Sequence, residues 1–323
     1  MARPLNAGRR PRVDVGVITF NTRDVTVKAL RQLLDSDQGA DLRILVHDNA
    51  SSDGTVEALA REVPEADVVA CPDNLGFAAG MNRLLARAEA PWFFALNSDA
   101  WPEPGAVGIL VAAAEAAPTA AAIAPLLLRP DGSLEHSTFP FPSVGIAAIC
   151  AVGGYHRWLG RRADELMLVG SWQHDRPRRV DWAVGAALLM RRSIADQVGG
   201  WDERFFMYAE DLEWCWRAAR LGFEVRFEPR SIVRHVGGAS SAKTYGSTTP
   251  LAYMRNSYRT YRRYHGPVST AAYRGLNLAG AVRQLAVSRL RRDTPRAAYW
   301  RTQVRSNLVS TRGIDKPVAR TAA

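Results

Sequence analysis

VDVGVITF, residues 13–20, is a short run of β-branched and other apolar residues, which predicts a buried strand. Three more runs of this kind follow along the chain: LRILVHDNAS (42–51), DVVAC (67–71) and WFFALNSDA (92–100). Residues 24–36 and 55–62, which lie between these runs, have helical character. Alternation of strand and helix at such short spacing predicts an α/β fold, a mainly parallel sheet flanked by helices.

Polar residues end three of these predicted strands. They are Thr19–Asn21, Asp48–Ser51 and Asn97–Asp99. In open α/β sheets, ligands bind outside the carboxyl ends of the strands. We therefore expect one binding site, to which three strands contribute polar groups.

The composition is that of a globular protein, with 323 residues, 47% hydrophobic and 23% charged. The net charge of +10 is uneven, because residues 255–323 hold 15 Lys and Arg against two acids. This segment carries +13, which leaves −3 for residues 1–254. The basicity belongs to the tail, which argues against nucleic-acid binding as the main function.

Targeting signals are not evident in the sequence. The three cysteines include no CxxC pair, so a reducing cytoplasm is expected, with neither a disulfide framework nor a zinc ribbon. The basic N-terminus is not followed by a signal-peptide pattern. The apolar residues 105–128 are interrupted by Pro118, which predicts an Ala-rich helix that Pro104 opens, and then a strand. We expect no transmembrane span.

Two of the polar strand ends suggest ligands. Asn97 and Asp99 flank Ser98, and two oxygen donors on one side of a turn suit a hard divalent cation that also takes phosphate oxygens. A strand-ending Asx turn explains the same residues. Asp48 could accept the imide N–H of uracil or thymine, although a turn with a helix cap is an equal alternative.

NLGFAAGMN, residues 74–82, brings two glycines and two asparagines to a helix start. Glycine lets the backbone approach a ligand closely, and helix N-termini attract phosphate. The spacing matches neither GxGxxG nor a P-loop, so the pattern alone indicates little.

FFMYAEDLEWCWRAARLG, residues 205–222, places Glu210 and Asp211 at the start of a predicted helix whose cap is Gly222. The helix dipole favours the ionised carboxylates there, so they cap the helix or supply a general base. His235 stands in RHVGGASS, a flexible loop that could close over a diphosphate, although a lone histidine is more often structural.

Together and in this order, several segments resemble the inverting glycosyltransferases of family 2, which have a GT-A fold. The matching stretches are VITFN, HDNASSDGT, NLGFAAGMN, ALNSDA, VGAALLMRR, GGWDERFFMYAEDLEWCWRAARLG and RHVGG. They cover about residues 13–240, and GGWDERFFMYAEDLEWCWR is most similar to the rhamnosyltransferase-like branch. The combination is specific, whereas no single motif is.

The resemblance implies a nucleotide-sugar site. Asp48 is expected to bind the pyrimidine of the donor, in a pocket that Thr19 and Asn21 line and Asn74 helps to hold. Residues 97–99 match the DxD motif of the family, in which the last Asp binds the metal. Asn97 stands in place of the first Asp of this motif, a variant that rhamnosyltransferase-like members often carry.

The resemblance also implies the remaining site residues. Asp99 and His235 are expected to hold Mg²⁺ or Mn²⁺, which neutralises the leaving diphosphate. Asp211 matches the catalytic base, with Glu210 beside it at the acceptor. Trp182 and Gly185 match residues that form the wall of the acceptor site in the family.

The expected domain organisation follows. Residues 1–12 are expected to be disordered, and 13–250 to form the GT-A domain. Its nucleotide-binding half is about 13–100 and its acceptor half about 101–250, and 251–323 form a basic helical tail. Such helices can lie on an anionic membrane surface. The alternatives are a solvated tail or a contact with another subunit, for example in a homo-oligomer.

The expected function is metal-dependent inverting transfer of a sugar, first of all L-rhamnose from dTDP-rhamnose. The acceptor would be a polyprenyl-diphosphate-linked or polymeric cell-envelope glycan, at the inner face of the bacterial membrane. One alternative is a UDP-sugar donor for galactofuranosyl or N-acetylglucosaminyl transfer, because the imide contact cannot separate uracil from thymine. The other is a catalytically inactive GT-A scaffold.

Overall fold

The computed structural model describes residues 10–153, 160, 174–237 and 249–311. The first of the described residues, Arg10, already forms an ion pair with Asp37, at 2.7 Å. Residues 1–9, most of the segment expected to be disordered, lie outside the described residues.

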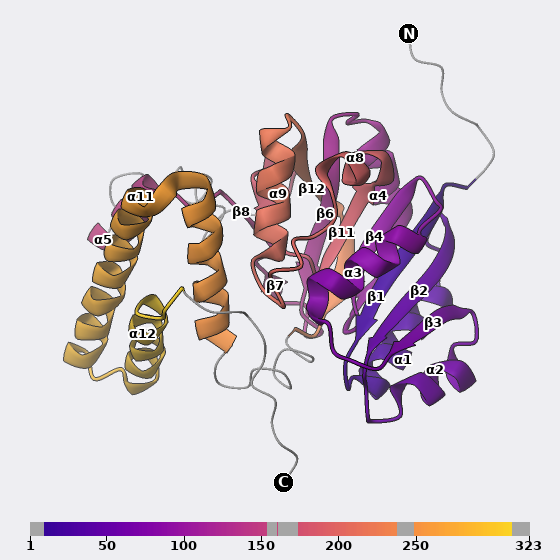
Figure 1. Ribbon diagram of the computed structural model, residues 1–323, viewed down its shortest axis with the longest axis horizontal. Coiled ribbons are helices and arrows are strands. Elements are labelled where there is room, and N and C mark those ends of the chain that lie inside the picture. Colours follow the sequence, from indigo (N-terminus) through magenta and orange to yellow (C-terminus); the bar gives the residue numbers. More distant parts are fainter. Residues whose placement is uncertain (1–9, 154–159, 161–173, 238–248, 312–323) are drawn as a thin grey trace.

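A mixed sheet forms the centre of the molecule (Figure 1). Its main path runs β3-β2-β1-β4-β11-β6-β12-β5, with β7 paired to β6 and β9 paired to β12. The strands are β1 (Arg12–Thr19), β2 (Asp41–Asn49), β3 (Ala66–Cys71), β4 (Trp92–Asn97), β5 (Ala100–Pro102), β6 (Ala120–Leu128), β7 (Leu134–Glu135), β9 (Arg178–Val180), β11 (Ala187–Arg191) and β12 (Glu224–His235). A separate pair consists of β8 (Thr138–Phe139) and β10 (Trp182–Ala183).

Parallel pairing brings the polar strand ends together, as predicted. In β1, Thr19 lies opposite Asp48 of β2, and Ile18 lies opposite Asn97 of β4. The β11 strand runs antiparallel to both of its neighbours, β4 and β6, so the sheet is mostly parallel but mixed. The residues of β11 are nearly all buried, and an apolar strand of this kind has the same pattern in either direction.

Helices cover both faces of the sheet (Figure 1). The covering helices are α1 (Arg23–Leu34), α2 (Thr55–Glu62), α3 (Gly76–Arg87), α4 (Ala106–Glu115), α8 (Arg192–Val198) and α9 (Glu210–Arg220). The other helices, α5 (Val144–Val152), α11 (Thr249–Leu290) and α12 (Thr294–Asn307), lie beside the sheet. Side chains alternate across a strand, so the neighbours Phe93 and Phe94 enter different cores. Phe93 packs with α3, α8 and α9, and Phe94 packs with α1, α2 and α4.

The C-terminal helices lie beside the sheet, where α11 packs with α12 and with α5 (Figure 1). Near its middle, α11 bends at Gly266, whose φ is 75°, and Pro267 follows the bend. The helix also contacts α9, so it is connected to the main fold. Across the described ranges, none of the helices combines the length and the apolar character needed to cross a membrane.

Candidate functional site

A cavity of about 310 Å³ opens at the carboxyl ends of the central strands. It gathers eight of the predicted site residues from five separate parts of the chain. They are Asn74, Asn97, Asp99, Trp182, Gly185, Glu210, Asp211 and His235. The structure therefore brings together both the residues expected at the diphosphate and those expected at the acceptor.

Three predicted nucleotide-binding residues lie beside this cavity rather than in its lining. Asp48 is 1% exposed, and its carboxylate accepts hydrogen bonds from the Thr19 hydroxyl at 2.7 Å and the Ser51 N–H at 2.8 Å. Asn21 joins the same loop, since its N–H donates to the Ser51 hydroxyl and its Oδ1 accepts from Ser52, both at 2.8 Å. These contacts shape the two loops, and contact with a pyrimidine stays a prediction.

Asn49, the neighbour of Asp48, lines the cavity instead. Its Nδ2 donates to the carbonyl of Gly76 at 3.2 Å, and its Oδ1 accepts from the Leu75 N–H at 3.2 Å. Because successive side chains on a strand face opposite sides, only one of the pair Asp48–Asn49 can face the cavity. The sequence motif predicted Asp48 as the ligand-binding residue and did not single out Asn49.

The start of α3 approaches the segment before α9 closely. Gly76 has a φ of 82°, and a Cβ at this position would lie 2.3 Å from the carbonyl oxygen of Phe206. The same carbonyl accepts a hydrogen bond from Phe77 N–H at 2.8 Å. Asn74 stabilises the turn through a 3.0 Å hydrogen bond from the Gly76 N–H to its Oδ1. Glycine is therefore needed here for close backbone packing.

Asn82 of the same motif holds a second loop. Its side chain accepts from the Trp201 N–H at 2.7 Å and donates to the Trp201 carbonyl at 2.9 Å. Gly80 lies over His47 and Ile18, which leave little room for a Cβ. Neither Asn82 nor Gly80 lines the cavity, so in this structure both support packing rather than ligand binding.

An acid–imidazole cluster forms one wall of the cavity. His235 Nε2 lies 3.2 Å from Oδ1 of Asp99, and its Nδ1 lies 3.0 Å from Oε2 of Glu135. Asn97 completes the group, with Nδ2 3.2 Å from the same Nε2. Burial alone would lower the pKa of His235, but hydrogen bonds and charges from Asp99 and Glu135 outweigh it and raise the pKa to about 9.

Sequence analysis did not find Glu135, which also lines the cavity. This residue lies in β7, a strand of two residues that pairs with the end of β6. Strands this short leave no periodic pattern, and Glu135 belongs to none of the recognised motifs. Only the fold places it next to His235.

Asp99 and His235 could together hold a divalent cation, provided that the ion displaces the proton of the imidazole. Within the described residues, no group of three or more His, Cys, Asp or Glu side chains is arranged to hold a metal ion. Mg²⁺ and similar ions are, however, often bound by one or two protein ligands together with substrate phosphates. A carboxylate on the far nitrogen of a ligating histidine is the usual support of such a site, and Glu135 occupies that position.

Asp211 lies in the first turn of α9, at another side of the cavity. Its Oδ2 accepts a hydrogen bond from the Gly185 N–H at 3.0 Å, and its Oδ1 accepts from the Leu212 N–H at 2.7 Å. Burial raises the pKa of Asp211 in spite of these hydrogen bonds. Burial disfavours the charged form of this carboxylate, whereas the helix dipole and the two backbone hydrogen bonds favour it.

The two residues before α9 have strained backbone conformations. Tyr208 and Ala209 have φ values of 73° and 68°, in the left-handed region that favours glycine. Both line the cavity. Strain of this kind persists where surrounding contacts impose it, and it gathers at functional sites.

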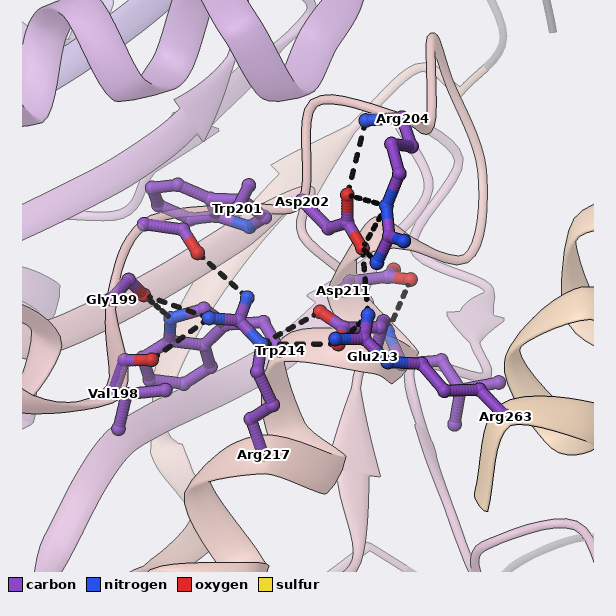
Figure 2. Close-up of polar contacts among 12 residues, drawn as sticks. Val198, Gly199, Trp201, Asp202, Arg204, Asp211, Glu213, Trp214, Arg217 and Arg263 are labelled. Atoms are coloured by element: carbon purple, nitrogen blue, oxygen red, sulfur yellow. Dashed lines mark hydrogen bonds and ion pairs between the residues drawn. The ribbon is translucent and has the colours of Figure 1, made fainter. Parts of the chain in front are cut away.

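A buried carboxylate anchors α9 from its other side (Figure 2). Glu213, which is 0% exposed, forms an ion pair with Arg217 at 2.8 Å. Arg217 also donates to the carbonyls of Val198 and Gly200, at 2.8 and 2.6 Å. Trp214 adds a 3.0 Å hydrogen bond to the carbonyl of Gly199. These contacts fix the helix that carries Asp211.

Comparison with known families agrees with the motifs. Residues 14–139 match the family described as Glycosyl transferase family 2, and residues 141–311 match the one described as Glycosyl transferase family group 2. Among curated relatives, the N-acetylglucosaminyl-diphospho-decaprenol L-rhamnosyltransferase of Mycobacterium tuberculosis is 33% identical over 230 residues, 67% of this chain and 73% of the relative.

Solved glycosyltransferase structures share the fold. The mannosyltransferase PcManGT from Pyrobaculum calidifontis, in complex with GDP-Man and Mn²⁺, has a TM-score of 0.56 at 18% identity, covering 93% of this chain and 88% of its own. GalNAc-T7 with UDP, GalNAc and Mn²⁺ has a TM-score of 0.58 at 13% identity, covering 95% of this chain and 56% of its own. The chain belongs to glycosyltransferase family 2 and has the GT-A fold that its motifs predicted.

Proposed function

We propose that this glycosyltransferase moves L-rhamnose from dTDP-rhamnose to an N-acetylglucosaminyl-diphosphate-lipid acceptor, with inversion at the anomeric carbon. The observation that carries the proposal is the shared cavity, in which Asp99 and His235 form one wall and Asp211 another. The name of the 33% identical relative supports rhamnose as the sugar and the diphosphate-linked lipid as the acceptor.

On the donor side, Asp99 and His235 would hold Mg²⁺ or Mn²⁺ together with the diphosphate of the nucleotide-sugar. A divalent ion supplies charge neutralisation to a departing diphosphate. Glu135 keeps the imidazole of His235 oriented through its contact with Nδ1. Asn97 contributes an amide to the same wall, where it can donate to a phosphate oxygen.

On the acceptor side, Asp211 is the proposed general base. The Gly185 N–H fixes one carboxylate oxygen, and the raised pKa makes the carboxylate a better proton acceptor than an ordinary aspartate. It takes the proton from the attacking hydroxyl as the new glycosidic bond forms. Attack from the face opposite the diphosphate inverts the configuration in one displacement, without a covalent intermediate.

A lipid-linked acceptor would place the enzyme at the inner face of the cell membrane. Residues 255–323 hold 15 Lys and Arg against two acids, and α11 and α12 make up most of this segment. Basic helices are attracted to anionic lipid headgroups. We therefore propose a peripheral, cytoplasmic-face location, with these helices at the membrane surface.

The first test is a thermal-shift panel of dTDP, UDP, GDP and ADP, each with and without Mg²⁺ or Mn²⁺. A ligand that binds only the folded protein raises its melting temperature. We expect a metal-dependent shift that is largest with dTDP. A larger shift with UDP would transfer the proposal to a UDP-sugar donor, and no shift with either pyrimidine nucleotide would contradict the donor site.

The second test is transfer itself. The purified enzyme is incubated with dTDP-rhamnose and a short-chain synthetic N-acetylglucosaminyl-diphospho-lipid, and the product is identified by mass spectrometry. Its anomeric configuration is then determined by NMR. Nucleotide binding without turnover on any donor would instead favour an inactive GT-A scaffold.

A further inference from the structure

The C-terminal helix α11 supplies part of the cavity wall. Tyr253, near its start, lines the same cavity as Asp211, although the sequence placed this residue in the basic tail. Its ring meets that of Tyr208 edge to face, with centroids 6.3 Å apart and planes at 80°. The two rings, together called the tyrosine pair, belong to residues 45 positions apart in the sequence.

A hydrogen bond from α11 holds the backbone next to the tyrosine pair. The fully buried Asn256 donates from Nδ2 to the carbonyl of Met207 at 3.0 Å, immediately before the strained residue Tyr208. Tyr208 and Ala209 then lead directly into α9 and Asp211. This contact ties the segment before α9 to α11, the helix that carries Tyr253.

The charges near the tyrosine pair determine which class of ligand can bind there. Glu210 and Asp211 follow Tyr208 closely in the chain and line the same cavity, so they disfavour a phosphate group directly against the two rings. A sugar ring is neutral, with an apolar C–H face that packs on aromatic rings and hydroxyls that hydrogen-bond to tyrosine. Tyr253 is 39% exposed, so its ring is accessible for such packing.

We propose that Tyr208 and Tyr253 form the subsite for the sugar ring of the acceptor, next to the base Asp211. The inference rests on the proposed function, because it takes the ligand at this end of the cavity to be the acceptor glycan. It assigns α11 a direct part in substrate recognition, in addition to any contact with lipid.

The test compares Tyr253→Ala and Tyr253→Phe with wild type in the transfer assay. We expect Tyr253→Ala to raise KM for the synthetic acceptor about tenfold, the effect of losing one aromatic contact, and to leave KM for dTDP-rhamnose unchanged. Tyr253→Phe keeps the ring and should retain most of the affinity. Tyr299→Ala is the matched control, since Tyr299 is an exposed tyrosine of α12 outside the cavity lining.

Unchanged acceptor KM in Tyr253→Ala, or an equal rise of donor and acceptor KM, would overturn the subsite. A binding readout covers the case in which no rhamnose transfer occurs. Saturation-transfer NMR is recorded with methyl glycosides of N-acetylglucosamine, galactose and rhamnose as probes, in the presence of dTDP. A signal lost in Tyr253→Ala and kept in Tyr299→Ala supports the subsite even where the proposed acceptor is wrong, and no signal with wild type contradicts it.

Discussion

Arg263 of α11 donates to Glu213 of α9 across 3.0 Å, and the carboxylate that it contacts is completely buried (Figure 2). The neighbouring Tyr264 donates to the same Oε1 at 2.9 Å. Glu213 lies two positions after Asp211 in the same helix. The C-terminal helix is therefore joined to the helix that carries the proposed base.

Glu213→Gln should lower the free energy of unfolding by about 3 kcal/mol or more, because it leaves the Arg217 and Arg263 guanidinium groups facing a neutral amide. Arg263→Ala should cost only about 1 kcal/mol, since the Arg263 side chain is 45% exposed and its ion pair is screened by solvent. Urea unfolding at pH 7 measures both. Arg262→Ala, at the exposed neighbouring position, is the control and should resemble wild type.

Asp211→Asn should lower the transfer rate about 10²- to 10⁴-fold, the usual contribution of a general base. The amide oxygen can still accept from the Gly185 N–H, so the fold should be kept. The pKa of Asp211 is higher in the folded protein than in the unfolded chain. Its contribution to stability is therefore fully present below the unfolded pKa, and it is lost as the pH rises through the folded pKa. At neutral pH the removal of the buried charge stabilises the variant, and the loss of the hydrogen bond from the Leu212 N–H destabilises it, so its stability should be close to that of wild type. Retained turnover in Asp211→Asn would remove this residue as the base.

The fold was largely predictable because strong local signals agreed with the global architecture. The apolar runs of β1, β2 and β4 each ended in polar residues, and parallel pairing necessarily brings such ends to one edge. The direction of β11 could not be predicted, because residues on either side of it, rather than its own pattern, determine how it enters the sheet.

Some residues that line the cavity could be predicted because they stand in sequence motifs. Others reach the cavity only through tertiary packing. Asp99, Asp211 and His235 stood in recognisable motifs, and all three line the cavity. Glu135 and Tyr253 did not, because a two-residue strand and the start of a long basic helix have no distinguishing pattern. Their positions follow from chain packing between segments far apart in sequence.

Asp202 should make the protein sensitive to acid. Burial alone would raise its pKa, but hydrogen bonds from Arg204 and the charges of Arg204 and Arg263 outweigh burial and lower the pKa to about 2. The stability that this carboxylate contributes is therefore fully present above its unfolded pKa, near 4, and is lost as the pH falls toward 2. The total loss is about 2 kcal/mol.

Asp202→Asn removes this dependence, so its free energy of unfolding should fall less than that of wild type between pH 5 and 2.5 (about 2 kcal/mol less across the full titration). Urea unfolding at several pH values provides the comparison. Asp24→Asn serves as control, because Asp24 is an exposed acid whose ion pair with Arg23 lies at the surface. Parallel pH profiles for wild type and Asp202→Asn would contradict the assignment.

Gly76 and Gly105 allow the cost of close packing to be separated from the cost of backbone conformation. Both glycines have left-handed φ values, 82° and 76°, but only Gly76 faces an obstacle, the Phe206 carbonyl at 2.3 Å from a Cβ. A Cβ at Gly105 would have nothing within 4 Å. Gly105→Ala should therefore cost about 1 to 2 kcal/mol, the usual penalty of an L-residue in this region.

Gly76→Ala should cost more, because relieving the contact with Phe206 must also break the 2.8 Å hydrogen bond from Phe77 to the same carbonyl. That displacement moves the turn carrying Asn74, at the cavity wall. The thermal shift that dTDP with Mn²⁺ produces should then shrink in Gly76→Ala and stay intact in Gly105→Ala. Equal stability losses and equal nucleotide shifts in the two variants would mean that the approach of α3 to the segment before α9 does not support the donor site.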